Sequence, residues 1–300
     1  MNGRSLAYSE RIATAPEQIT ATFGADFREN PGLVDSLRHP QAILIRKVLT
    51  RSGRMELKLI LIDDEENIIQ ALDAGVEIHS LYYTGVLPSA ELIRKLQHRV
   101  IIHEIARRTC KKIFENDKIS RLFAIARTPS ALTLDSLLGI PRDIVALEDL
   151  TISGNIGAIV RTSLAFSAGG IVLLNAEHSD IYDRRLIRAS RGHVFSLPIL
   201  TATTEEFLYF CEQKRIPIAA MTAQADRAVH EAAVQPVRLA IVLGGEKGGC
   251  SEMLMNAAAL RVRIPTNSMV ESLNVSTAAG IMLYNRLWFN HPQDGKRADL

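Results

Sequence analysis

Three loops of this chain hold the residues whose types and spacing could do chemistry. In the first, residues 151–170, Asn155 stands between two glycines where a helix N-cap is expected. Arg161 follows six residues later, about a turn and a half along the predicted helix. The residues around Arg161 are mostly apolar, so the arginine needs a partner. That partner is either a buried acid in a structural ion pair or an anion or hydroxyl of a ligand.

The second loop, residues 242–251, places four glycines around Glu246 and Lys247, after a predicted strand and before a predicted helix. Glycine lets the backbone approach a ligand closely. The spacing fits neither the GxGxxG dinucleotide fingerprint nor the GxxxxGK[ST] phosphate loop, which disfavours a dehydrogenase or a P-loop enzyme. A flexible turn without a ligand is the alternative interpretation.

The third loop, residues 264–274, follows an apolar strand that is expected to end at 264–265, and it brings Ser272 and Asn274 to the start of the last predicted helix. Either residue alone could cap that helix. Two polar side chains two residues apart can also reach one site if the segment is still extended before the helix begins.

Basic residues are unevenly distributed, although the net charge of the chain is only +2. Between residues 99 and 127, eight basic side chains face three acidic ones, the local excess expected of a phosphate-binding face. In a second group, Arg184, Arg188 and Arg191 are expected to share one helical face. For both groups, phosphate contacts and a solvated charged surface remain open.

Alternating apolar runs and helical patterns must position these loops, and they predict two α/β domains. In the first, strands are expected at 57–64, 78–85, 100–105 and 121–128, with helices at 65–76, 89–97 and 106–115. In the second, strands are expected at 143–150, 169–175, 216–222 and 238–246, with helices at 156–168, 182–191, 204–214, 251–258 and 274–288. Continuous Val, Ile and Leu runs in the second set indicate a buried parallel sheet.

The expected boundaries are an N-terminal extension at 1–40, a small domain at 41–128, a linker at 129–142, a larger domain at 143–290 and a tail at 291–300. Three widely separated cysteines suggest neither a disulfide framework nor a metal site. The N-terminus lacks an apolar signal sequence and no apolar run reaches 18 residues, so we expect no membrane span and a cytoplasmic protein.

Taken in order, four segments resemble the signature motifs of the SPOUT superfamily, and more narrowly the TrmH-type RNA ribose 2′-O-methyltransferases. The segments are 155–174, 188–198, 241–251 and 264–281. The upstream segments 68–83 and 123–129, together with 183–198, look like the thiostrepton and nosiheptide resistance methyltransferases. The resemblance to the superfamily covers about residues 143–290.

The resemblance implies an S-adenosylmethionine-dependent α/β enzyme whose C-terminal domain forms a trefoil knot. It also implies a homodimer and an N-terminal α/β domain, similar to a ribosomal protein, that binds RNA. The implied substrate is a ribose 2′-hydroxyl of large-subunit ribosomal RNA, an adenosine of the GTPase-associated region, whose methylation gives thiopeptide resistance. A transfer-RNA substrate and a non-catalytic RNA-binding relative remain the alternatives, and no metal is required.

The motif positions carry the family roles over to this sequence. The implied catalytic set is Arg161, Asn155, Glu246, Ser272 and Asn274. The implied cofactor loops contain Leu243, Gly244, Gly245, Ile264, Thr266 and Leu273, with Thr266 standing where the family usually has methionine. The expected RNA contacts are Arg54, Lys58, Lys111, Lys112, Lys118, Arg121 and Arg127 in the first domain and Arg184, Arg188 and Arg191 in the second.

Overall fold

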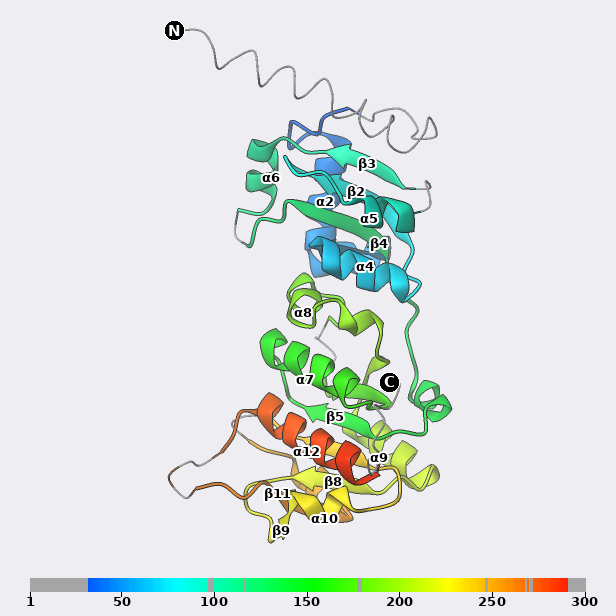
Figure 1. Cartoon of the computed structure of the whole chain (residues 1–300), viewed down its shortest axis with the longest axis vertical. Coiled ribbons are helices and arrows are strands. Elements are labelled where there is room, and N and C mark those ends of the chain that lie inside the picture. Colours follow the sequence, from blue (N-terminus) through cyan, green and yellow to red (C-terminus); the bar gives the residue numbers. More distant parts are fainter. Residues whose placement is uncertain are drawn as a thin grey trace. The chain divides into compact units, whose positions relative to one another are not determined.

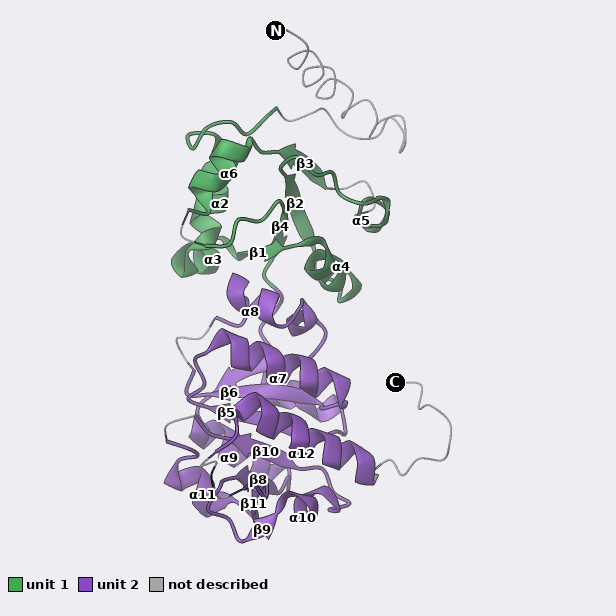
Figure 2. Ribbon diagram, turned by 60° about the vertical axis from the view of Figure 1, so that its left-hand side comes forward, with its two compact units in different colours: residues 1–128 green, residues 129–300 purple. Residues whose placement is uncertain are grey.

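The computed structural model describes residues 32–96, 100–115, 117–176, 180–245, 248–267, 269 and 272–290. The chain divides into two compact units, Met1–Thr128 and Pro129–Leu300, which Figure 2 colours separately. Most of the expected N-terminal extension and all of the expected tail lie outside the described residues. Each unit is described by itself below.

Among the described residues of the first unit, four strands form a mixed sheet in the order β1-β4-β2-β3. Strand β4 (Leu122–Arg127) is antiparallel to both β1 (Leu59–Asp63) and β2 (Ile78–Tyr83). The edge strand β3 (Ile101–Glu104) is parallel to β2. All four strands lie within the ranges expected from the sequence.

Helices cover both faces of this sheet (Figure 2). On one face, α2 (Pro40–Leu49) and α6 (Arg107–Ile113) pack on Leu61, Tyr82 and Phe123 in a hydrophobic core. Helix α3 (Arg51–Leu57) follows α2 directly, and α4 (Glu65–Asp73) and α5 (Ala90–Lys95) lie on the other side. Helices α2 and α3 were not predicted from the sequence, although Pro40 at the first helical position of α2 is a start signal.

In the second unit, the described strands form a seven-stranded sheet in the order β7-β6-β5-β10-β8-β11-β9. Every neighbouring pair is parallel, so the predicted buried parallel sheet is confirmed. The strands are β5 (Ile144–Glu148), β6 (Gly170–Leu174), β7 (Ile199–Ala202), β8 (Ile218–Met221), β9 (Arg227–Ala228), β10 (Ala240–Leu243) and β11 (Leu260–Arg263). The short strands β7 and β9 have no periodic signal and were not predicted.

Helices α9 (Thr204–Gln213) and α11 (Glu252–Ala257) pack against one face of this sheet through Phe207, Phe210 and Leu254. Helix α12 (Val275–Asn290) packs against α7 (Ser153–Ala165) and α10 (Val229–Ala233), and α8 (Arg184–Ala189) packs against α7 (Figure 1). Helices α7 and α8 approach each other so closely that only glycine fits at position 157, because a Cβ on Gly157 would stand 2.4 Å from the Cβ of Ala189.

The segment expected to be a linker, residues 129–142, belongs to this second unit. It carries a 3-10 helix, Leu134–Gly139, whose Leu137 is fully buried and packs in the core with Ile144. Pro129 and Pro141 therefore flank a 3-10 helix that packs on the core of the second unit, and not an unstructured linker.

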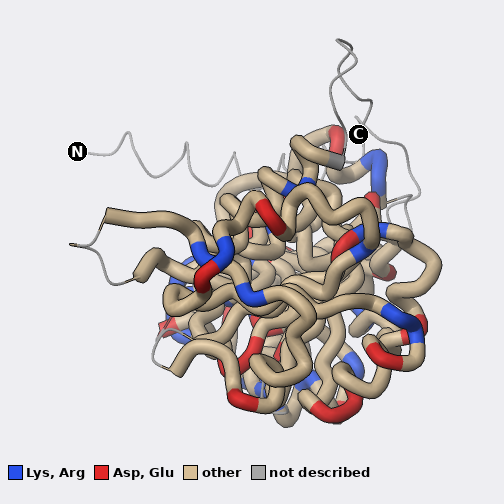
Figure 3. Tube along the Cα trace, turned by 90° about the horizontal axis from the view of Figure 1, so that it is seen from below, with Lys and Arg blue, Asp and Glu red and all other residues tan. Residues whose placement is uncertain are grey.

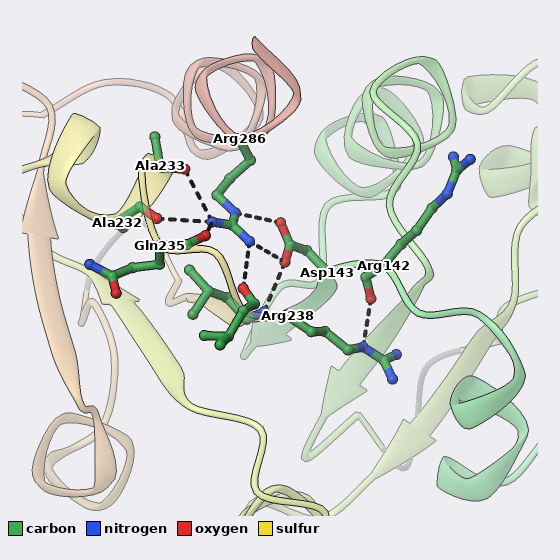
Figure 4. A network of polar contacts seen from close by, with 9 residues as sticks. Arg142, Asp143, Ala232, Ala233, Gln235, Arg238 and Arg286 are labelled. Atoms are coloured by element: carbon green, nitrogen blue, oxygen red, sulfur yellow. Dashed lines mark hydrogen bonds and ion pairs between the residues drawn. The ribbon is translucent and has the colours of Figure 1, made fainter. Parts of the chain in front are cut away.

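An arginine near the end of α12 ties that helix to the start of the sheet (Figure 4). Arg286 is 4% exposed, and its Nε and Nη2 donate to the two carboxylate oxygens of Asp143 at 2.6 and 2.9 Å. Its remaining N–H groups donate to backbone carbonyls of the 232–237 segment. Asp143 also accepts from the backbone N of Leu239. Because every donor of the guanidinium has an acceptor, the buried charge is stabilised and fixes α12 in place.

Candidate active site

A cavity of about 480 Å³ lies at the carboxyl edge of the parallel sheet, where β8, β10 and β11 end. Such edges are where ligands of open α/β sheets bind. All six residues expected to bind a cofactor line it, together with two of the expected catalytic residues. The six are Leu243, Gly244, Gly245, Ile264, Thr266 and Leu273, and the two are Ser272 and Asn274.

The glycine loop that follows β10 folds back on itself beside this cavity. The backbone N of Gly249 donates to the carbonyl of Gly245 at 2.9 Å, closing a short bridge between the two residues. A Cβ on Gly244 would stand 1.9 Å from the carbonyl carbon of Gly249, so no side chain fits there. Gly249 has a φ of +64°, which glycine adopts without strain. Glu246 lies outside the described residues.

The side chain of Asn274 forms two kinds of hydrogen bond at the mouth of the cavity. Its Oδ1 accepts from the backbone N of Ser276 at 2.9 Å, which caps the first turn of α12. Its Nδ2 donates to Oδ1 of Asn155 on α7 at 3.2 Å. The cap and the contact between motifs therefore use the two ends of one carboxamide.

Asn155 does not occupy the N-cap position predicted from the sequence. The N-cap of α7 is Ile152, and Asn155 is the third residue of the helix. The helix starts three residues earlier than predicted, at Ser153 rather than at 156. Asn155 thereby faces Asn274 rather than the free amides of its own first turn.

Arg161 lies about 9 Å further along α7 than Asn155 at 1.5 Å per residue. The side chain is exposed, does not line the cavity, and forms no ion pair with an acid in the described part of the chain. Of the two alternatives left open by the sequence, the structural ion pair with a buried acid is not found in the described residues, since Arg161 is exposed. Burial, followed by the charges of Arg161 and Arg191, lowers the pKa of His193.

Arg184, Arg188 and Arg191 do not share one helical face as predicted. Helix α8 ends at Ala189, and Arg191 lies in the turn that follows, with a φ of +53°. Arg184 is buried at 5% exposure and Arg188 is half-buried, whereas Arg191 is exposed. Of these three predicted RNA contacts, Arg191 alone is exposed.

The cations predicted for the first unit also separate into two kinds. Arg54 is buried, and its Nη1 donates to the carbonyls of Val48 and Leu49 at 3.1 and 2.9 Å, which holds the end of α2. We therefore remove Arg54 from the expected RNA contacts. The others are exposed: Lys58, Lys111, Lys112, Lys118, Arg121 and Arg127. Of these, Lys118 is paired with Asp64 and Arg127 with Glu77.

The cavity also has walls that sequence analysis did not name. The end of β8 and the turn after it contribute Met221, Thr222 and Gln224, whose only signal is their place at or just after the end of the strand predicted at 216–222. Glu148, the last residue of β5, does not line the cavity but is a buried carboxylate next to the glycine loop, and it was not predicted to have a role. In the described residues no group of three His, Cys, Asp or Glu side chains could hold a metal ion. At the end of the molecule seen in Figure 3, positive and negative segments are interspersed.

Comparison with known proteins shows which protein family this chain belongs to. The model of the SpoU rRNA methylase family matches residues 143–284, and the model of the thiostrepton-resistance methylase N terminus matches residues 31–139. A 23S rRNA (adenosine(1067)-2′-O)-methyltransferase of Streptomyces azureus is 35% identical over 258 residues, which cover 85% of this chain and 96% of that protein. The chain belongs to the SpoU rRNA methylase family.

Solved structures of RNA methyltransferases agree with this assignment. A crystallised RNA 2′-O ribose methyltransferase superimposes with a TM-score of 0.74 at 29% identity, covering 86% of this chain and 99% of that one. An AdoMet-bound rRNA methyltransferase of Sinorhizobium meliloti gives 0.71 at 27% identity, covering 85% and 97%. The resemblance drawn from the motifs, and the prediction of an RNA methyltransferase, are confirmed. None of the helices in the described parts of this SpoU methylase is long and apolar enough to cross a membrane.

Proposed function

We propose that this SpoU methylase transfers a methyl group from S-adenosylmethionine to the ribose 2′-hydroxyl of an adenosine in the GTPase-associated region of 23S ribosomal RNA. Methylation there gives resistance to thiopeptide antibiotics. The proposal is supported by the adenosine-specific relative that aligns along most of the chain and by the match to the thiostrepton-resistance N terminus. Ribosomal RNA places the enzyme in the cytoplasm.

The cavity fits the cofactor in size and chemistry. Its volume of about 480 Å³ lies within the range of roughly 300–1,000 Å³ that is usual for small-molecule pockets. Leu243, Val262, Ile264 and Leu273 give it apolar walls, and the glycine loop offers backbone amides without side chains in the way. Where the family usually has methionine, Thr266 lines the cavity as part of the extended 264–267 segment.

One observation carries the proposed mechanism: the hydrogen bond between Asn274 and Asn155 joins the first and third motifs at the cavity mouth. When bound, the cofactor supplies an activated sulfonium methyl group. The task of the protein is to align the ribose oxygen and favour loss of its proton. Ser272 and Asn274 orient that hydroxyl. Arg161 stabilises the developing alkoxide and holds the neighbouring phosphate, since a guanidinium with a pKa above about 12 is a poor base.

Because Arg161 does not line the cavity of its own chain, we propose that the active enzyme is a homodimer in which it completes the site of the partner. An exposed aromatic surface on α12 supports this proposal. Tyr284, Trp288 and Phe289 are each about half exposed, and the ring of Tyr284 lies 5.7 Å from that of Phe166 at the end of α7. Exposed apolar patches of this kind mark interfaces.

The trefoil knot remains part of the proposal. It is supported by the path of the chain, which leaves β11 near one edge of the sheet and returns along α12 to pack beside α7. The first unit is proposed to hold the RNA through its exposed cations, without a metal ion.

Methyl transfer to fragments of 23S ribosomal RNA and to transfer RNA, with the modified nucleotide mapped by mass spectrometry, tests the function. We expect one ribose-methylated adenosine in the ribosomal fragment, and Arg161→Ala should fold and bind cofactor but lose about a hundredfold or more of the rate. Methylation of transfer RNA alone would favour the first alternative. Cofactor binding with no transfer to either RNA would favour the non-catalytic one.

A further inference from the structure

Glu148 is a buried carboxylate at the carboxyl end of β5 that the mechanism above does not use. It is 2% exposed and forms no ion pair with a lysine or arginine in the described ranges. Its Oε2 accepts from the backbone N of Ser251 at 2.7 Å, and its Oε1 lies 3.5 Å from the hydroxyl of Thr204. Burying a carboxylate is costly unless it is well hydrogen-bonded, so its place in the fold needs a reason.

A chain of side chains holds this carboxylate in one position. Thr204 Oγ1 accepts from Nδ2 of Asn175 at 3.0 Å, which leaves its proton to point at Glu148. The backbone N of Thr204 in turn donates to Oδ1 of Asn175 at 3.1 Å. Residues from the ends of β5 and β6 and from the starts of α9 and α11 thus meet at Glu148, which cannot swing out to solvent.

The same carboxylate lies against the glycine loop of the cavity. Leu147 pairs with Leu243 in the ladder between β5 and β10, so the next residue, Glu148, lies beside Gly244. The backbone of Glu148 is close to the loop as well, since a Cβ built on Gly245 would lie 3.7 Å from its main-chain carbonyl oxygen; the carboxylate itself reaches the loop at the backbone N of Ser251. Burial, and then the charge of Glu148, raises the pKa of the Cys250 thiol to about 12. The carboxylate of Glu148 therefore lies beside Cys250 and Ser251, the last two residues of the glycine loop that borders the cavity.

We propose that Glu148 is a specificity-determining residue, whose buried negative charge makes the cavity prefer cationic S-adenosylmethionine over neutral S-adenosylhomocysteine. This inference rests on the proposed function, because it assumes that this cavity binds the cofactor. The two ligands differ by the methyl group and by the positive charge on sulfur. A charge away from water is weakly screened, so its removal changes the affinity for the cation more than for the neutral thioether. Because S-adenosylhomocysteine binds more weakly, this product can dissociate after methyl transfer.

The test is calorimetric titration of the full chain with each ligand separately. In Glu148→Gln, which keeps an acceptor for Ser251 but loses the charge, we expect the affinity for S-adenosylmethionine to fall about fivefold to tenfold. The affinity for S-adenosylhomocysteine should change less than about twofold. A purely structural role of Glu148 would weaken both ligands by the same factor, and that result would overturn the proposal.

Two further variants separate charge from contact. Asp149→Asn removes the same charge from the neighbouring, exposed residue, whose φ of +53° suits asparagine, and should leave the ratio of the two affinities unchanged. Glu148→Asp keeps the charge but shortens the side chain, so both ligands should bind more weakly at an unchanged ratio. Should Glu148→Gln not fold, a lost preference in Glu148→Asp overturns the proposal. If the unaltered chain binds neither ligand, the proposed function fails, a result distinct from equal weakening in a variant.

Discussion

Asn274 Nδ2 donates to Asn155 Oδ1 at 3.2 Å across 119 residues of sequence. The same carboxamide caps α12 through the backbone N of Ser276. Helix position and site geometry are thus linked through one side chain. A change at Asn274 affects both, whereas a change at Asn155 leaves the cap in place.

The first prediction separates these two effects. Asn274→Ala should lower the free energy of unfolding by about 1 kcal/mol through loss of the cap and should also reduce methyl transfer. Asn274→Ser, which keeps a capping oxygen, should restore the stability but not the rate. Urea unfolding and methyl-transfer assays on the same preparations measure the two quantities. If the serine variant recovers full transfer, the contact with Asn155 has no role in the reaction.

The second prediction concerns the glycine loop. Gly244→Ala should weaken cofactor binding at least tenfold, because its Cβ would collide with the backbone of Gly249 and open the loop. Gly248→Ala is the matched control, since nothing lies within 4 Å of a Cβ built there. Calorimetric titration with S-adenosylhomocysteine compares the two variants. Equal binding by both would mean that the closed form of the loop is not the binding form.

The third prediction tests the anchor of α12. Arg286→Met removes the partner of the buried Asp143 carboxylate and should cost about 3–5 kcal/mol of unfolding free energy. Arg227→Ala, which breaks an exposed pair with Glu231, should change it by less than about 0.5 kcal/mol. Denaturant titration at neutral pH measures both. A double variant, Arg286→Met with Asp143→Leu, should recover part of the loss, because no unpaired charge then remains buried.

The fourth prediction concerns pH and the first unit. His103 stacks on Tyr82 with ring centroids 5.0 Å apart, and its Nδ1 is buried without a hydrogen bond to any described residue. Burial, with the charges of His39 and His79, lowers the pKa of His103 to about 4. The unfolded chain, with a histidine pKa near about 6.5, binds this proton first, so stability present above pH 6.5 is lost as the pH falls toward 4.

The loss should be on the order of 2 kcal/mol between pH 7 and pH 4, and it should be smaller in His103→Gln, which has no proton to gain. Urea unfolding of both proteins at a series of pH values isolates the contribution of His103 from that of the carboxylates. Parallel stability curves for the two proteins would contradict the assignment.

The fifth prediction separates RNA contacts from structural arginines. Lys112→Ala removes an exposed cation and should weaken RNA binding while reducing the slope of log affinity against log salt by about 1. Arg54→Ala should instead destabilise the fold by about 1–3 kcal/mol, because two carbonyls at the end of α2 lose a buried donor. Fluorescence anisotropy with ribosomal RNA over a salt series, beside thermal melting, distinguishes these effects.

Much of the fold and of the site followed from local patterns in the sequence. The strands that were predicted are continuous apolar runs, and the sheet of the second unit is parallel as those runs indicated. Strands β7 and β9 and helix α10 were missed because they are short and take their structure from neighbouring elements. Helix α2 was missed beside a proline-rich segment, although Pro40 and His39 begin it.

The sequence by itself determined the motifs, and through them the family and the residues that surround the cavity. Only the tertiary structure decided which side chains are available. It buried Arg54 and Arg184, exposed Arg161, and moved Asn155 from a helix cap to a partner of Asn274. Periodicity specifies which face of an element is apolar, but burial and partners depend on what other segments bring to that face. The buried carboxylate of Glu148 shows this best, since its partners lie 56 and 103 residues away in the chain.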